Sequence, residues 1–265
     1  MAVTIGQLES ADNNRLIAML KDLSSPLDPE MIGFVAGLAS NRERADLVRE
    51  ESAVLLGRIQ QPESRNRLLE FTQADDPVVR ELGALGLGED NESATVLTLI
   101  GQLSDSVNKV RNVAERSLLK RSEAVASVGV EPLIQLLSHS AVLTRSPAAR
   151  LLGQTKDERA LQPLIQQLKA EEWLDRMWGA NGLGSLGVLE VVSDLQQLAK
   201  EDPKNRVRAS AVEALGELRP PNLQEFLDEI IEDESDEGVR KTAEELKLSL
   251  GFDSDDLEYD PFADD

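Results

Sequence analysis

The residues best suited to bind a ligand lie in one short stretch that ends at Asn181. Both tryptophans of the chain, Trp173 and Trp178, fall within it. At helical spacing, Trp173 shares a face with Arg176, and Trp178 shares a face with Asp175. A flat apolar ring beside a cation and an acid would suit an aromatic ligand that bears carboxylates, or the hot spot of a protein partner. The alternative is that the tryptophans only pack between neighbouring helices.

A second candidate is a basic stripe formed by Lys109, Arg116 and Lys120. Their spacings of i, i+7 and i+11 place them on a narrow strip of one helix. An acidic partner could dock on this strip. The alternative is a basic face that is simply solvated.

Residue types that would support catalysis or metal binding are scarce. The chain has one histidine, His139, and no cysteine, which excludes disulfides, thiolate ligands and a cysteine nucleophile. We expect His139, in a Ser-His-Ser segment, to be a turn or cap residue. The sequence has no phosphate-binding loop with its lysine and no G-x-S-x-G elbow. No catalytic residue and no metal site are therefore predicted, and the chain is more typical of a binding protein than of an enzyme.

Charge is distributed unevenly along the chain. The formal net charge of −21 argues against a nucleic-acid partner, because affinity for phosphates comes mainly from Lys and Arg. Residues 232–265 carry 14 acidic and 3 basic side chains, whereas residues 106–150 carry 7 basic and 3 acidic ones. The last segment, residues 252–265, also contains three aromatic residues and is too polar to bury a core, so we expect a disordered acidic tail. It would serve either as a solubilising end or as an acidic, aromatic docking peptide.

One arginine recurs in a fixed frame, at spacings of 31, 31, 34, 31, 32 and 32 residues. The seven copies are Arg49, Arg80, Arg111, Arg145, Arg176, Arg208 and Arg240. A small residue follows each of them three positions later, and a leucine follows seven positions later in six copies. Self-similarity at one such period is typical of a repeat array. The arginines could bind a carboxylate partner, but regular spacing favours internal hydrogen bonds that join one repeat to the next.

The elements that must position these residues are helical. Each arginine lies in an apolar segment of about 12 residues that ends in Leu-Gly or an equivalent, where we expect Gly to supply a left-handed residue. A second amphipathic segment follows, with 161–168 as the clearest case, and no run of alternating β-branched residues indicates a strand. The sequence predicts an all-α fold of about seven helical pairs wound into a right-handed superhelix. We expect a capping region at 1–46, a repeat array at 47–251 and the tail at 252–265.

The pattern V-R-x-x-A-x-x-x-L-G followed by D-x-R-A-L-x-P-L-I-x-x-L, clearest over 150–168, resembles the HEAT-like repeats of the phycobilisome lyase group. In such repeats the recurrent arginine pairs with an acid of the preceding turn. The resemblance implies the pairs Asp76 with Arg80, Asp105 with Arg111, Asp175 with Arg176, Asp202 with Arg208, and Asp236 with Arg240. The fourth repeat departs from the pattern, because it has His139 in place of an acid, three extra residues and Pro147. We expect a local change of curvature there.

Two functions follow as expectations. The first is a non-enzymatic scaffold, adaptor or assembly factor that binds another protein. The second, implied by the resemblance, is a phycobilin lyase subunit or bilin chaperone for cyanobacterial phycobiliproteins, which would bind a bilin as its only cofactor and could require a second HEAT-like subunit. No stretch approaches the roughly 20 apolar residues that span a bilayer, so we expect a cytoplasmic protein without membrane insertion.

Overall fold

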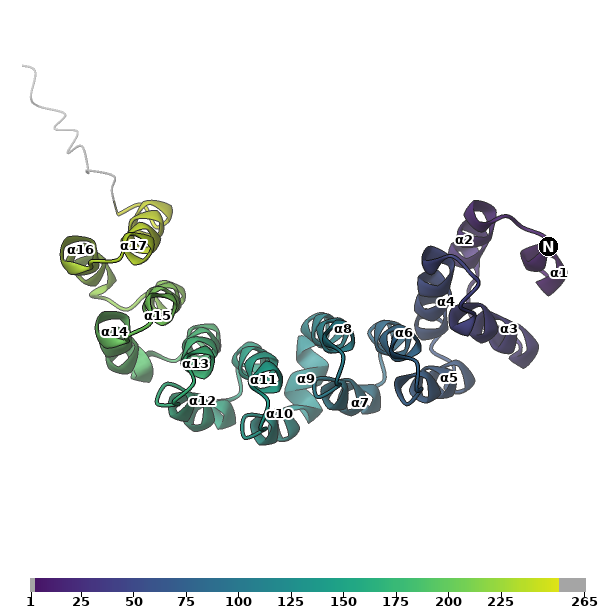
Figure 1. Cartoon of the computed structure of the whole chain (residues 1–265), viewed down its shortest axis with the longest axis horizontal. Helices are drawn as coiled ribbons and strands as arrows, with labels where there is room; N and C mark the ends of the chain where they lie inside the picture. The colour runs from purple at the N-terminus through teal and green to yellow at the C-terminus, as the bar shows by residue number, and fades with distance from the viewer. Residues whose placement is uncertain (1–2, 253–265) are drawn as a thin grey trace, which may run out of the picture. The chain divides into compact units, whose positions relative to one another are not determined.

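The computed structural model describes residues 3–252, and over this range the chain forms α-helices, two short 3₁₀ turns and no β-strand (Figure 1). The predicted tail lies outside the described residues, except for Phe252. The helices group into two compact units, one up to Leu133 and one from Ile134. The predicted all-α fold, an α-solenoid of HEAT-like repeats, is confirmed. Within residues 3–252, no helix has the length and apolarity needed to cross a membrane.

Unit 1 begins with short helices and continues as stacked pairs. Its helices are α1 (Ile5–Glu9), α2 (Asn13–Asp22), α3 (Pro29–Ser40), α4 (Asp46–Arg58), α5 (Pro62–Thr72), α6 (Pro77–Leu87), α7 (Ala94–Gln102), α8 (Asn108–Leu119) and α9 (Ser122–Val128). The arginine-bearing helices α4, α6 and α8 pack side by side in one layer, which we call the ladder layer, and α3, α5 and α7 cover it. Asp12 and Asp28 cap α2 and α3 by accepting hydrogen bonds from the backbone amides of Arg15 and Met31.

Unit 2 repeats the same two-layer arrangement. Helix α10 (Val130–Leu136) lies across the division between the units, and the helices after it are α11 (Val142–Thr155), α12 (Leu161–Gln167), α13 (Trp173–Leu186), α14 (Val192–Glu201), α15 (Asn205–Leu218), α16 (Leu223–Asp233) and α17 (Glu237–Ser249). The ladder layer is α11, α13, α15 and α17, each packed on the next, and α12, α14 and α16 cover it (Figure 1). Leucines and alanines fill the space between the layers, and nearly all are completely buried.

The recurrent glycines serve close packing rather than left-handed turns, which corrects the expectation from the sequence. Gly153 lies inside α11, and a Cβ added to it would come within 2.3 Å of the carbonyl oxygen of Gly182 in α13. A Cβ on Gly182 would come within 2.7 Å of the carbonyl oxygen of Ala149. In four of the turns the left-handed residue falls three positions after the glycine, as in Lys156 (φ 56°) and Gly187 (φ 84°). Neighbouring ladder helices therefore touch backbone to backbone at these positions.

The fourth repeat contains a helix that the sequence did not predict. In place of one covering helix it has α9 and α10, separated by Gly129. A Cβ at Gly129 would come within 2.9 Å of both the Val125 carbonyl oxygen and the Ile100 side chain, so the chain turns there in tight contact with its neighbours. This insertion accounts for the 34-residue spacing between Arg111 and Arg145.

Candidate functional site

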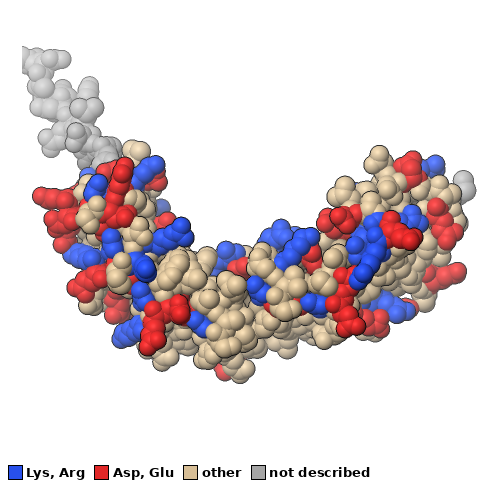
Figure 2. Space-filling view, in the orientation of Figure 1, with Lys and Arg blue, Asp and Glu red and all other residues tan. Residues whose placement is uncertain are grey.

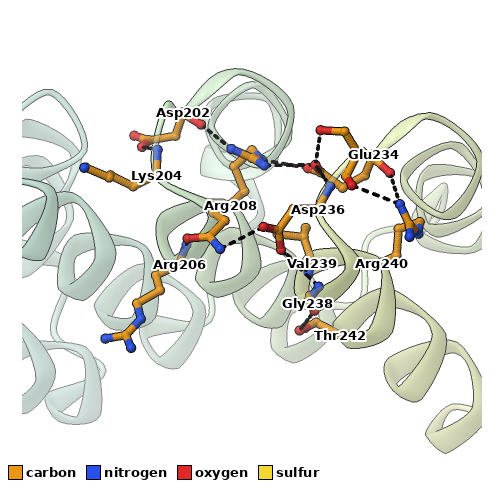
Figure 3. A network of polar contacts seen from close by, with 12 residues as sticks. Asp202, Lys204, Arg206, Arg208, Glu234, Asp236, Gly238, Val239, Arg240 and Thr242 are labelled. Carbon is orange, nitrogen blue, oxygen red and sulfur yellow. Dashed lines mark hydrogen bonds and ion pairs between the residues drawn. The ribbon is translucent and has the colours of Figure 1, made fainter.

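The recurring arginines form a ladder of ion pairs along one edge of unit 2. Arg176 donates from Nε to Asp202 Oδ2 at 2.6 Å, and Arg208 donates from Nε to Glu234 Oε2 at 2.7 Å. The Nη1 atom of Arg208 also donates to the Asp202 carbonyl oxygen at 2.8 Å, so each guanidinium joins its own preceding turn to the turn of the next repeat (Figure 3). The predicted role as internal links between repeats is confirmed for Arg145, Arg176 and Arg208 and, in unit 1, for Arg80, whereas the other three recurrent arginines donate to backbone carbonyls of the segment that precedes them. We call this set of rungs the arginine ladder.

The carboxylate partners differ from those that the resemblance implied. Asp175 does not pair with Arg176, because its carboxylate accepts from Arg145 Nη2 at 2.6 Å. Asp202 likewise pairs with the arginine of the preceding repeat and not with the side chain of Arg208. In unit 1 the same shift applies, since Asp105 pairs with Arg80 at 2.7 Å and gives Arg111 only its backbone carbonyl. The direction of the arginine side chain explains this difference. Its Nη1 atom contacts carbonyl oxygens of the turn that precedes its own helix, whereas Nε and Nη2 point toward the carboxylate in the turn of the next repeat.

The two remaining implied pairs are also absent. Asp76 accepts from Arg42 Nε at 2.9 Å, in the preceding turn, and not from Arg80. Asp236 accepts from the side-chain amide of Asn205 at 2.9 Å and from the first backbone amides of α17. Arg240 instead donates to the Glu234 carbonyl oxygen at 2.7 Å. Asp76 and Asp236 therefore act mainly as N-caps of α6 and α17 and not as partners of the ladder arginines that follow them.

Hydrogen bonding across the rungs changes the acidity of both partners. The side-chain hydrogen bond from Arg80 holds the pKa of Asp105 below its ordinary value, despite the opposing effect of burial. The hydrogen bond from Arg208 lowers the pKa of Glu234 in the same way. The pKa of each arginine is raised by its carboxylate. The rungs are therefore ionised on both sides at neutral pH and are structural rather than poised for proton transfer.

The tryptophans lie beside the ladder, half-buried, and each is covered by an arginine of a neighbouring repeat. The guanidinium carbon of Arg150 on α11 lies 5.8 Å from the ring centre of Trp178. That of Arg206 on α15 lies 6.0 Å from the ring centre of Trp173. Both distances fit a cation–π contact. Asn181, two turns after Trp173 on the same face of α13, is also partly exposed. We call Trp173, Trp178, Asn181, Arg150 and Arg206 the tryptophan surface.

Of the five predicted binding residues, Trp173, Trp178 and Asn181 are partly exposed, whereas the other two are engaged in ion pairs. Asp175 is 5% exposed and Arg176 is bound to Asp202, so both belong to the arginine ladder. The cation beside each tryptophan comes from a neighbouring repeat. Residue spacing within one helix could not predict this contact. Alignment of the repeats would have revealed it, because Arg150 and Asn181 occupy the same position five residues after a ladder arginine.

A shallow hollow of about 180 Å³ lies at the N-terminal ends of α13 and α15. It is lined by Trp173, Lys204, Asn205 and Arg206. In Figure 3 the side chain of Arg206 extends away from Arg208 and Glu234 and takes no part in the network. This end of the tryptophan surface therefore combines an aromatic ring with exposed positive charge.

The predicted basic stripe on α8 is largely neutralised. Lys109 Nζ lies 3.1 Å from a carboxylate oxygen of Glu81, and Lys120 Nζ lies 3.2 Å from one of Glu89, both on the preceding repeat. Arg116, between them, is exposed. These contacts favour a solvated face of ion pairs over an open basic site. His139 is a turn residue as expected, since its Nδ1 accepts from the Ala141 amide and its carbonyl accepts from Arg145.

Another hollow, of about 460 Å³, lies between α14 and α16 and is lined mainly by charged side chains. Asp202, Arg208 and Glu234 in its wall belong to the arginine ladder, so their charges are already paired. Figure 2 shows acidic side chains gathered over this end of unit 2. Among residues 3–252, no group of three or more His, Asp or Glu side chains is arranged to hold a metal ion.

Comparison with known proteins agrees with the architecture. Residues 161–247 match the family model of HEAT repeats. No curated protein shows significant sequence similarity to the chain. Among solved structures, importin beta aligns with a TM-score of 0.59 at 16% identity, over 93% of this chain and 38% of that one.

Two further structures align over most of their length. An archaeal HEAT-like repeats protein from Thermococcus onnurineus NA1 aligns with a TM-score of 0.53 at 15% identity, over 86% of this chain and 98% of that one. Human deoxyhypusine hydroxylase, 22% identical over 90% of each chain, aligns with a TM-score of 0.40. The family model, together with importin beta and the archaeal protein, supports HEAT-like repeats as the architecture of the chain.

Proposed function

We propose that this chain is a non-enzymatic scaffold or adaptor that binds another protein through the tryptophan surface of unit 2. The observation that carries the proposal is the pair of half-buried tryptophans, each under an arginine of a neighbouring repeat. Trp and Arg are the residue types most enriched at the energetic centres of protein interfaces. At the position of Trp178, neighbouring repeats carry Pro147 and Ser210, both buried, so the half-buried ring is not required by the repeat.

The rigidity of the ladder layer supports the same proposal. Backbone contacts between α11 and α13 and the rungs to Asp175 and Asp202 fix α13 on both sides. A binding surface whose side chains are held before the partner arrives loses less conformational entropy on association. The shallow hollow at Trp173 is smaller than the pockets of roughly 300–1,000 Å³ that enclose small ligands, which favours a protein partner.

Affinity capture from a native lysate, with mass spectrometry, tests this function. The bait is compared with a Trp173→Ala, Trp178→Ala double variant and with a control that removes exposed apolar side chains elsewhere, Leu97→Ala with Leu189→Ala. We expect a partner that binds the wild type and the control and binds the tryptophan variant about tenfold or more weakly. Equal recovery of every protein by the three baits would contradict the proposal.

Phycobilin binding is the alternative function. A conjugated tetrapyrrole with carboxylate groups would stack on Trp178 and pair with Arg150, and the cation–π contact at this site supports that role. Absorbance titration of the protein with a bilin tests it. A spectral shift that Trp178→Ala abolishes would support a lyase subunit or bilin chaperone. No shift, or a shift that this substitution leaves unchanged, would reject it.

A further inference from the structure

We infer that the acidic C-terminal segment of this chain, residues 253–265, docks on the tryptophan surface and competes there with the partner. The inference rests on the proposed function for its biological meaning, but its test uses the purified chain alone. The segment contains seven Asp or Glu residues, no Lys or Arg, and the aromatic residues Tyr259 and Phe262. It is therefore an acidic peptide that also carries two aromatic rings.

The chemistry of the tryptophan surface is complementary to such a peptide. Lys204 and Arg206 are exposed at the N-terminal end of α15, beside the ring of Trp173. Two carboxylates close to these cations are already engaged, since Asp236 accepts from Asn205 and Asp202 belongs to the arginine ladder, whereas Glu171 and Glu172, just before Trp173, are exposed. A carboxylate of the segment could pair with either cation while a neighbouring aromatic side chain packs on the tryptophan ring.

The charge pattern of α15 also gives the docking a direction. Arg206 lies in the first turn of the helix, whereas Glu213 and Glu217 are exposed along its second half. Partial burial, and after it the nearby charge of Glu217, raise the pKa of Glu213. An acidic peptide is thus attracted to the N-terminal end of α15, where Lys204 and Arg206 are exposed, and repelled from the second half of this helix.

The segment is long enough to reach this end of the layer. Helix α17 ends at Ser249, two ladder helices away from α13. Adjacent helices pack 8–10 Å apart and a 14-residue helix is about 20 Å long, so the path from the end of α17 to Trp173 is about 30 Å. Thirteen extended residues span about 43 Å. A tethered segment experiences an effective concentration on the order of 1 mM, so an intrinsic Kd of about 100 µM gives about 90% occupancy.

The composition of the chain supplies the measurement. Its single tyrosine, Tyr259, lies in the segment, and its only two tryptophans lie on the proposed docking surface. Energy transfer from tyrosine to tryptophan therefore reports directly on docking in the full-length protein. We expect tyrosine-sensitised tryptophan emission in the wild type. We expect its loss in a variant whose seven acids from 253 to 265 are changed to Asn or Gln, because the charge attraction is removed. High salt should reduce it as well.

A matched control neutralises acids elsewhere and should change nothing. Glu225→Gln with Glu232→Gln removes two exposed charges from α16 while leaving the segment intact. A site variant, Lys204→Gln with Arg206→Gln, should abolish the transfer although the segment is unchanged, with circular dichroism confirming that the helices remain. Equal transfer in the wild type and the segment variant would overturn the inference. A signal that rises with protein concentration would also overturn it, because the segment would then bind a second copy.

Partner affinity separates this inference from the proposed function. If both hold, the segment variant should bind the captured partner about tenfold more tightly, since the competing tethered peptide is gone. If the segment does not dock, the energy-transfer test fails while capture by the tryptophan surface is unaffected. If the tryptophan surface binds no partner, the energy-transfer result still stands.

Discussion

At the scale of single residues, the arginine ladder shows how one side chain can join two repeats. The guanidinium of Arg176, for example, donates to a carbonyl of its own turn and to the carboxylate of Asp202 in the next turn, and that carboxylate is nearly buried. A charge that is buried with its partner is tolerated, whereas a charge left alone in the same place is costly. The contribution of the arginine ladder to stability is therefore best measured by replacing the carboxylate of one arginine–carboxylate pair.

Asp202→Asn should lower the free energy of unfolding by about 2–4 kcal/mol. The substitution leaves Arg176 ionised and 13% exposed with no carboxylate opposite it. The control is Glu201→Gln, the preceding residue, whose exposed carboxylate only accepts from Gln197. Urea denaturation followed by circular dichroism gives both values. A loss for Asp202→Asn no larger than that for Glu201→Gln would show that the rung contributes little.

Repeat-to-repeat contacts also explain which parts of the site could be predicted from the sequence. The period located every ladder arginine and most covering helices, because helix formation and burial follow local spacing. The period could not predict that Asp175 pairs with Arg145. This pairing depends on the arginine side chain extending from its own repeat toward the next one, which spacing along the sequence does not specify. The partners of Trp173 and Trp178 were missed for the same reason. Helix α9 was not predicted, because the break at Gly129 depends on tertiary contacts with α7. The repeat spacing carries no information on these contacts.

At the scale of helices, the glycines decide how closely the ladder layer packs. Gly153 and Gly182 bring α11 and α13 together, and Gly184 brings α13 against Ala214 of α15 with 2.7 Å between its added Cβ and the alanine Cα. The side chains of the tryptophan surface come from these three helices. Their relative positions therefore depend on small residues that touch no ligand.

Gly182→Ala should destabilise the protein by about 1–3 kcal/mol, because its Cβ would force α11 and α13 apart. Gly33→Ala is the matched control, since Gly33 is an exposed position inside α3 with nothing within 4 Å of an added Cβ. That substitution should stabilise the protein by up to about 1 kcal/mol through helix propensity alone. Thermal unfolding of the two variants gives the comparison, and a stabilised Gly182→Ala protein would contradict the packing argument.

At the scale of the whole molecule, acidity and stability are linked through the rungs. Asp105 in unit 1 and Glu234 in unit 2 have pKa values below their ordinary values of 3.8 and 4.5, because their arginines hold the ionised form. In the unfolded chain both carboxylates take up protons at the higher, ordinary values. The unfolded state therefore binds more protons as pH falls, and stability falls with it. The contribution is complete above the ordinary values and is lost as pH decreases through the lowered ones.

A double variant isolates this effect from the large net charge. Lowering the pH also reduces repulsion within a chain of net charge −21, which acts in the opposite direction. Asp105→Asn with Glu234→Gln removes the two titrating groups and leaves the remaining charge nearly unchanged. The stability difference between wild type and variant should be constant near neutral pH and should shrink as the pH falls through the ordinary values of 4.5 and 3.8 and then through the lowered ones. Urea denaturation across this range measures it, and a difference that stays constant to the lowest pH would show that the rungs do not hold these carboxylates ionised.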